Sequence, residues 1–131
     1  MKLEIKHLAP YLPYGLRPNT AYEFTIVGAD LNSVYCSHPN FSMLKILSYK
    51  EFKPILRPLS DLTKVDIKEF YQCSDIDMGI MDWQEWAEEL CHLLKNDNPF
   101  QLRQFEYLYK RHFDVFGLIE NNLAIDINTL K

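Results

Sequence analysis

The chain has 131 residues, of which 47% are hydrophobic and 24% are charged, and its formal net charge is −4 at pH 7. These values are typical of a globular domain and exclude the low hydrophobicity and high net charge of a disordered protein. No apolar run approaches the roughly eighteen residues of a membrane helix. We therefore predict a single domain over residues 1–131 that does not associate with a membrane.

The cysteines and the N-terminal stretch both bear on the cellular compartment. Cys36, Cys73 and Cys91 are an odd number at wide spacing, which disfavours a disulfide framework. Glu4 and Lys6 interrupt the N-terminal stretch, which therefore lacks the continuous apolar centre of a signal peptide. We predict a cytoplasmic protein whose cysteines are free thiols.

The charge is distributed unevenly along the chain. Residues 1–64 contain eight Lys/Arg and five Asp/Glu, a net charge of +3, whereas residues 65–131 contain six Lys/Arg and thirteen Asp/Glu, a net charge of −7. The acidic half disfavours a general phosphate-binding surface. The opposite charges would suit head-to-tail association, but the favoured interpretation is a solvated surface.

The first segment in chain order, HLAPYLPYGLRP over residues 7–18, is rich in proline and in apolar residues. Pro10 and Pro13 fix their own φ and disfavour helix at the residues before them. We therefore predict a turn or a short extended run that covers the edge of the core. The alternative is a ligand for a partner domain that binds polyproline II helices.

The rest of the N-terminal half is predicted to form strands. Residues 22–28 alternate well, residues 33–37 are short and β-prone, and residues 41–49 fit a further strand, although a helical turn is possible there. Residues 53–57 give a short strand with Pro54 near its start. Together these segments predict a small, mostly antiparallel sheet.

The chain then changes character at residues 60–63, SDLT. These residues fit a helix start with Ser60 as the N-cap and Asp61 in the first turn. Residues 65–71 fit either a helix or a strand, and residues 72–81 are predicted to be a connection.

Two amphipathic helices are predicted next. Asp82 and Glu85 have the spacing of a capping box, and an apolar stripe predicts a helix over about residues 83–95. Asn98 followed by Pro99 predicts a second helix start. The two stripes are Trp83, Trp86, Ala87, Leu90, Cys91 and Leu94, and then Leu102, Phe105, Leu108, Tyr109, His112 and Phe113.

The tail completes the predicted fold. Gly117 is a plausible helix stop, and Ile125 and Ile127 lie on one face of an alternating segment that could add an edge strand to the N-terminal sheet. The predicted fold class is α+β: a small antiparallel sheet from the N-terminal half, packed by two C-terminal amphipathic helices, and a short closing tail.

Metal-binding patterns do not match the sequence. Cys36 and His38 are separated by one residue, and Cys91 and His92 are neighbours, whereas structural zinc sites use two pairs of ligands two to about four residues apart. A calcium loop that began at Asp75 would lack the required Gly and Glu. We predict no metal and no cofactor.

Catalytic motifs are equally scarce. The GxSxG, HExxH and P-loop patterns do not occur. His112 and Asp114, with Tyr109 near, could form an acid–base pair. The favoured interpretation is a half-buried histidine at a helix end, and an enzyme with a site near His112 and Asp114 is kept as an alternative.

A second alternative is binding of single-stranded nucleic acid by one basic, aromatic face of the sheet. The acidic isoelectric point near 5.5 disfavours it. The candidate residues are Arg17, Lys45, Lys53, Arg57 and Lys64, with Tyr14, Tyr49 and Phe52.

Three blocks carry a resemblance: HLAPYLPYGL near the start, KPILRPLSDLTK (53–64) and HFDVFGLIENNLAIDINTL (112–130). They resemble uncharacterised proteins encoded by prophages and mobile elements of gut-dwelling anaerobic bacteria. The resemblance implies an accessory protein of phage type, and it supplies no catalytic residues.

The leading functional prediction is therefore a non-enzymatic interaction or accessory protein with a protein partner. It depends on the aromatic content of 14% and on the lack of a catalytic constellation. The identity of the partner and the oligomeric state stay open.

Overall fold

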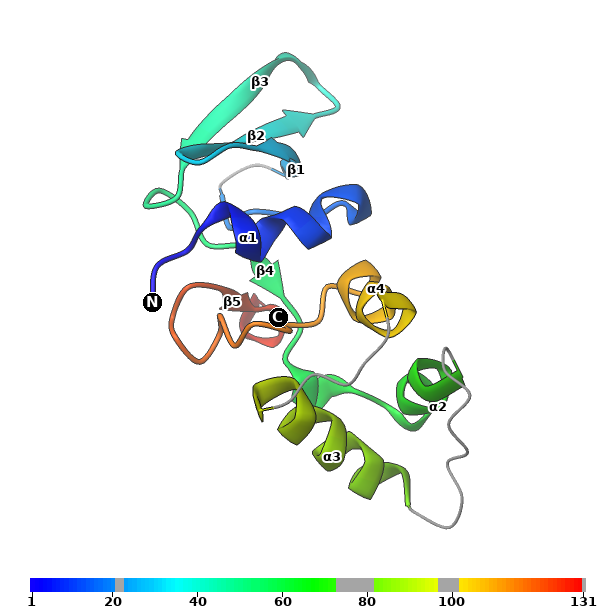
Figure 1. The fold of residues 1–131 in the computed structure, drawn as a ribbon. Coiled ribbons are helices and arrows are strands. Elements are labelled where there is room, and N and C mark those ends of the chain that lie inside the picture. The colour runs from blue at the N-terminus through cyan, green and yellow to red at the C-terminus, as the bar shows by residue number, and fades with distance from the viewer. Residues whose placement is uncertain (21–22, 73–81, 97–101, 131) are drawn as a thin grey trace.

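The structure is a computed structural model that describes residues 1–20, 23–72, 82–96 and 102–130. Its elements are α1 (Ile5–Leu8), the 3₁₀ helix η1 (Ala9–Tyr14), β1 (Thr25–Ala29), β2 (Ser33–His38), β3 (Phe41–Ser48), β4 (Ile55–Leu56), the 3₁₀ helix η2 (Leu59–Asp61), α2 (Lys64–Gln72), α3 (Trp83–Asn96), α4 (Leu102–Lys110), β5 (Ile125–Asp126) and the 3₁₀ helix η3 (Ile127–Leu130). The three-stranded sheet lies at one end, α1 lies beneath it, and α2 and α3 lie at the other end (Figure 1).

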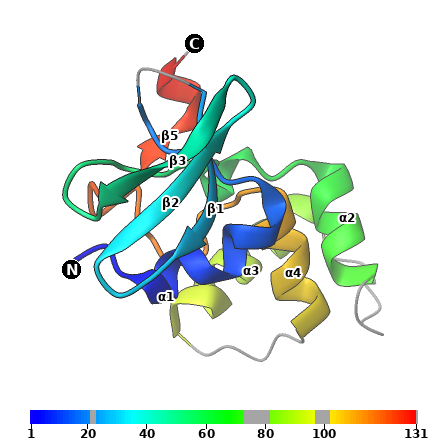
Figure 2. The same cartoon turned by 90° about the horizontal axis from the view of Figure 1, so that it is seen from above.

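The larger sheet has the strand order β1-β2-β3, and both pairings are antiparallel. Its inner face carries Ile26, Val34 and Cys36, all fully buried. Alternation of side chains across these strands places that apolar set against α1 and η1, which the view from the sheet end shows beneath the strands (Figure 2). The predicted α+β class, with an antiparallel sheet in the N-terminal half, is confirmed.

The N-terminal segment is helical, so the prediction of a turn or extended run at residues 7–18 is wrong for its first part. α1 and η1 together run from Ile5 to Tyr14, and η1 contains both prolines. The fixed φ of proline suits a 3₁₀ helix, and Pro10 lies in the first turn, where a backbone amide has no partner within the helix. η1 ends at Gly15, whose φ of +70° is left-handed and suits glycine.

α2 shows that residues 65–71 are helical. Thr63 Oγ1 accepts the backbone N–H of Asp66 at 3.2 Å, and the Asp66 carboxylate accepts the backbone N–H of Thr63 at 2.9 Å. This reciprocal arrangement is a capping box. The predicted helix start at Ser60 is wrong, because Ser60 lies within η2 and the cap forms three residues later.

The two predicted C-terminal helices are both present in the structure. α3 begins at Trp83, as the capping-box spacing predicts. α4 is described from Leu102, and the predicted start at Asn98 and Pro99 lies outside the described residues. Over the ranges that the structure describes, no helix combines the length and the hydrophobicity needed to cross a membrane.

The buried side chains form two clusters. The sheet core combines the inner face of the larger sheet with α1, η1 and residues after α4, and it includes Leu8 and Tyr11. The helical core lies among α2, α3 and α4 and includes Phe70 and Phe113. The tryptophans of α3 pack against the helical core, while η1 contacts both β1 and α4 and so lies between the sheet and the helices.

The C-terminal tail forms a second, small sheet. Ile55 of β4 lies opposite Ile125 of β5, and the pairing is parallel. The tail therefore pairs beside β4. The sequence had allowed it to join the N-terminal sheet as an edge strand, but it does not pair with the three-stranded sheet. The choice of partner follows from the chain path, because Arg57 bonds through its backbone to the residues just after α4 and brings β4 beside the tail.

Tyr11 connects the two cores. Its hydroxyl donates to the backbone carbonyl of Phe113 at 2.5 Å and accepts the backbone N–H of Val115 at 3.2 Å. The Tyr11 ring is fully buried in the sheet core, and the Phe113 ring is fully buried in the helical core. Burial raises the pKa of Tyr11 well above its ordinary value, so the hydroxyl keeps its proton and stays a donor.

We expect Tyr11→Phe to lower the free energy of unfolding by about 1–3 kcal/mol, because it leaves a buried carbonyl and a buried amide without their partner. Urea unfolding measures this loss. Tyr14→Phe is the matched control, since the Tyr14 hydroxyl makes no hydrogen bond to the described residues. Equal stability of the Tyr11 and Tyr14 variants would show that the buried hydroxyl does not hold the cores together.

Candidate functional site

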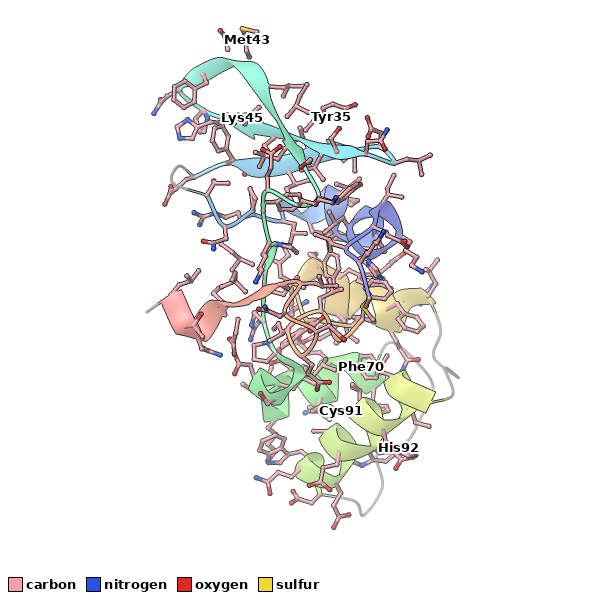
Figure 3. The ribbon with its side chains drawn as sticks, turned by 90° about the vertical axis from the view of Figure 1, so that its left-hand side faces the viewer. Tyr35, Met43, Lys45, Phe70, Cys91 and His92 are labelled. Atoms are coloured by element: carbon pink, nitrogen blue, oxygen red, sulfur yellow. The ribbon has the colours of Figure 1, made fainter. Side chains whose placement is uncertain are left out.

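The β2–β3 hairpin carries an exposed apolar surface, which we name the β3 surface and define as Phe41, Met43, Leu44 and Ile46. Their exposed fractions are 50%, 80%, 55% and 60%. Met43 lies at the end of the molecule away from α2 and α3 (Figure 3). A group of large exposed apolar side chains on one strand is a candidate for an interaction site.

β3 exposes both of its faces because only its last residues reach the sheet core. Leu47 lies opposite Val34 and is buried. Lys45, on the same face and opposite Cys36, is exposed. Ile46 points to the opposite face and is exposed as well. The first six residues of β3 therefore extend beyond the core, and apolar side chains are presented on two sides.

β3 is also an edge strand. β2 occupies the centre of the sheet, and within the described chain no further strand pairs with β3. An edge strand presents backbone N–H and C=O groups that a strand from another chain can join. Lys45 is the one charged residue in β3, and a lysine on an edge is a common device against indiscriminate pairing.

Tyr35 organises the outer face of the sheet beside the β3 surface. It lies opposite Gly28 on β1 and opposite Ile46 on β3. A Cβ at Gly28 would lie 3.3 Å from the Tyr35 ring, so the absence of a side chain lets the ring approach β1 closely. The Tyr35 hydroxyl donates to the carboxylate of Asp30, which fixes the ring at the outer face.

Asp30 closes the turn between β1 and β2. Its carboxylate accepts the backbone N–H groups of Asn32 and Ser33, each at 2.8 Å. The Tyr35 hydrogen bond is the largest of the causes that lower the pKa of Asp30 to about 2, followed by the bonds from Asn32 and Ser33. The carboxylate is therefore ionised at neutral pH and holds the hairpin turn and the Tyr35 ring together.

The inner side of the β3 surface borders a shallow apolar hollow of about 320 Å³. Phe24 and Phe41 form one wall, with their rings stacked at a centroid distance of 6.1 Å. Met43 and Leu44 line the remainder, and the Lys45 ammonium is the one charge that borders it among the described residues. This arrangement suits an apolar side chain that enters from a docked segment.

Three of the predicted nucleic-acid-binding residues, Arg17, Lys53 and Arg57, contact other side chains of the protein. Arg17 forms an ion pair with Glu23 at 3.5 Å, and the Lys53 ammonium donates to the Asn122 side chain at 2.9 Å. The Arg57 guanidinium stacks on a buried ring of the helical core, 4.2 Å from its centroid. Each of these three cations is thus engaged with the protein itself.

The other two predicted cations lie elsewhere. Lys45 is on β3, and Lys64 is the first residue of α2. Of the five, Lys45 alone belongs to the three-stranded sheet. The structure therefore does not gather these residues on one face of the sheet.

His112 and Asp114, the candidates for an acid–base pair, have separate partners. His112 has a φ of +62°, and its Nε2 lies 2.6 Å from the carbonyl oxygen of Tyr14. The Asp114 carboxylate accepts the backbone N–H groups of Leu118 and Ile119, each at 2.9 Å. The His112 ring thus joins the end of α4 to the end of η1, the Asp114 carboxylate closes the turn that follows, and these bonds do not join the two side chains to each other.

The sequence contains a local signal for the β3 surface. In FSMLKIL, apolar residues occupy both alternating sets, which is typical of a strand covered on both faces. Lys45 in the middle contradicts full burial. A strand that is apolar on both sides and charged at its centre is therefore a candidate for an exposed edge.

Comparisons with protein-family models, with curated proteins and with solved structures found no match.

We expect Tyr35→Phe to raise the pKa of Asp30 toward its ordinary value of 3.8, because the hydroxyl bond is the largest cause of the lowered value. A carboxyl pKa that is lower in the folded state stabilises the fold above the ordinary pKa and loses that contribution as the pH falls toward 2. The hairpin turn of the unchanged protein should therefore keep its order to a lower pH than that of the variant. NMR titration of the Asp30 carboxyl carbon measures both effects.

Tyr49→Phe is the matched control for this titration. The Tyr49 hydroxyl also bonds to Asp30, but to its backbone carbonyl oxygen, at 2.5 Å. Tyr49→Phe should therefore leave the pKa of the Asp30 carboxyl nearly unchanged. An Asp30 pKa that does not rise in the Tyr35 variant would contradict the proposed role of the hydroxyl.

Proposed function

We propose that this chain is a non-enzymatic protein-interaction module that docks a partner protein on the β3 surface. The supporting observation is that four large apolar side chains are exposed on one edge strand. Full burial of one such side chain contributes up to about 1.5–3 kcal/mol. Partial burial of four of them can therefore offset a substantial part of the entropy cost of association.

The partner contributes an extended segment that pairs with β3. Backbone hydrogen bonds along the edge would give affinity, and pockets for alternate side chains would give specificity. An apolar side chain of the segment would enter the hollow beside Phe24 and Phe41. An acidic residue opposite Lys45 would satisfy the one charge of the strand. Pairing of two copies centred on Lys45 would instead oppose two ammonium groups, which is destabilising.

The proposal includes an accessory role in the cytoplasm. The resemblance of residues 53–64 and 112–130 to prophage-encoded proteins supports the accessory role. The three widely spaced cysteines suit a reducing compartment. Cys36 is buried, and this burial raises the pKa of its thiol to about 11, so the thiol is an inert part of the sheet core.

The test compares the affinity-tagged protein with the double variant Leu44→Thr/Ile46→Thr in lysate of the source organism, with mass spectrometry of the bound proteins. We expect a partner on the unchanged chain and a loss of affinity of more than about tenfold in the variant, since two exposed apolar contacts are removed. Calorimetric titration with the purified partner then measures the change. Threonine keeps the β propensity of the strand.

The matched control is Val65→Thr/Leu102→Thr, which changes two apolar residues of the helices that are 62% and 71% exposed. It should bind the partner as the unchanged chain does. Equal binding by both double variants would place the interaction elsewhere. Turnover of a substrate without any bound partner would overturn the proposed function.

A further inference from the structure

We infer that a groove along α3 is a second docking surface, and that it receives a short, positively charged amphipathic helix of a partner protein. Two hollows of about 590 and 320 Å³ form the groove between α3, η2 and the turns after α4. Leu59, Ser60 and Cys91 line both hollows, so the two adjoin along α3.

The length and the walls of the groove favour a helix as its occupant. Along α3 the groove extends from Trp83 to Leu94, a rise of about 16 Å or three helical turns. Its walls are α3, η2 and the segment 114–120. These elements present side chains to the groove, whereas a strand edge would present backbone N–H and C=O groups. An amphipathic helix of about three turns is the peptide form that such a side-chain-lined groove accepts.

The floor of the groove is apolar. Leu59, Ala87, Leu94 and Val115 pack against the helical core and remain only partly buried. An apolar stripe at three- and four-residue spacing on the incoming helix would cover these side chains and remove the rest of their surface from water. α3 would then be packed on both of its sides.

The charges of the groove determine the sign of the occupant. Glu88 and Glu120 are exposed acids that line the groove, and Asp114 lines it as a buried carboxylate bonded to the turn after α4. No lysine, arginine or histidine does so among the described lining residues. Residues 65–131, to which all three acids belong, carry a net charge of −7. A lysine- or arginine-rich helix is complementary to this groove, whereas nucleic acids and anionic lipid surfaces are repelled.

This surface is distinct from the β3 surface. Cys91 lies near the helical end of the molecule, and Met43 lies at the sheet end (Figure 3). The β3 surface lies in the half of the chain with a net charge of +3, whereas α3 lies in the half with a net charge of −7. A partner on one surface therefore leaves the other accessible, and the inference does not depend on the proposed function of the hairpin.

The test uses a fluorescein-labelled peptide of about fourteen residues with leucines at helical i, i+3 and i+4 spacing and lysines elsewhere. We expect saturable binding in fluorescence anisotropy that weakens with added salt. The matched glutamate–leucine peptide should not bind. Glu88→Gln/Glu120→Gln should weaken binding of the lysine peptide by about three- to tenfold.

Two controls locate the bound peptide. Glu51→Gln/Glu106→Gln makes the same change in net charge at exposed acids outside the groove and should leave the affinity unchanged. Bound lysine peptide should also slow thiol modification of Cys91 in a Cys73→Ser chain, in which the remaining Cys36 is fully buried. The absence of saturable binding, equal weakening by the two double variants, or an unprotected Cys91 would each overturn the inference.

Discussion

The hydroxyl of Tyr11 is the contact on which the arrangement of the molecule most depends. It spans 102 residues of sequence and satisfies a carbonyl and an amide on either side of Asp114, where the chain leaves α4. One side chain thereby fixes the N-terminal helix to the start of the C-terminal tail. Because its bonds lie in a buried, low-dielectric environment, water cannot readily replace them.

The position of η1 explains why the sheet end and the helical end of the molecule expose different surfaces. η1 separates the sheet from α4, so the inner face of the sheet is covered by the N-terminal helices. β3 extends past that cover, which leaves the hairpin with apolar side chains on two sides. At the other end, α3 packs chiefly on α2 and keeps an apolar groove with acidic borders. Both candidate surfaces are thus consequences of how the layers are stacked.

Local patterns in the sequence predicted the elements better than their contacts. Local sequence predicted the three strands of the larger sheet, with clear alternation only in residues 22–28, and the apolar stripe predicted α3, because each pattern is determined within one element. The same sequence held the correct cap of α2, since Thr63 and Asp66 have capping-box spacing, whereas Ser60 is followed three residues later by a threonine. The helical character of Pro10 and Pro13 was missed because 3₁₀ geometry tolerates both residues.

Contacts between distant segments were beyond such patterns. Neither the bond from Tyr11 to Phe113 nor the pairing of β4 with β5 leaves a local periodicity. The candidate site shows the same limit: FSMLKIL was predicted to be a strand, but the exposure of its first six residues depends on where the core ends. The five predicted cations do not share one face of the sheet, because residue type alone does not determine where the fold places a side chain.

Urea unfolding monitored at two places tests most directly whether the sheet core and the helical core form one cooperative unit. Both tryptophans of the chain lie on α3, so their fluorescence follows the helical core, while the NMR amide signals of Val34 and Cys36 follow the sheet core. If Tyr11 joins the two cores as described, both signals will change at the same urea concentration. Two separate midpoints would contradict a single folding unit.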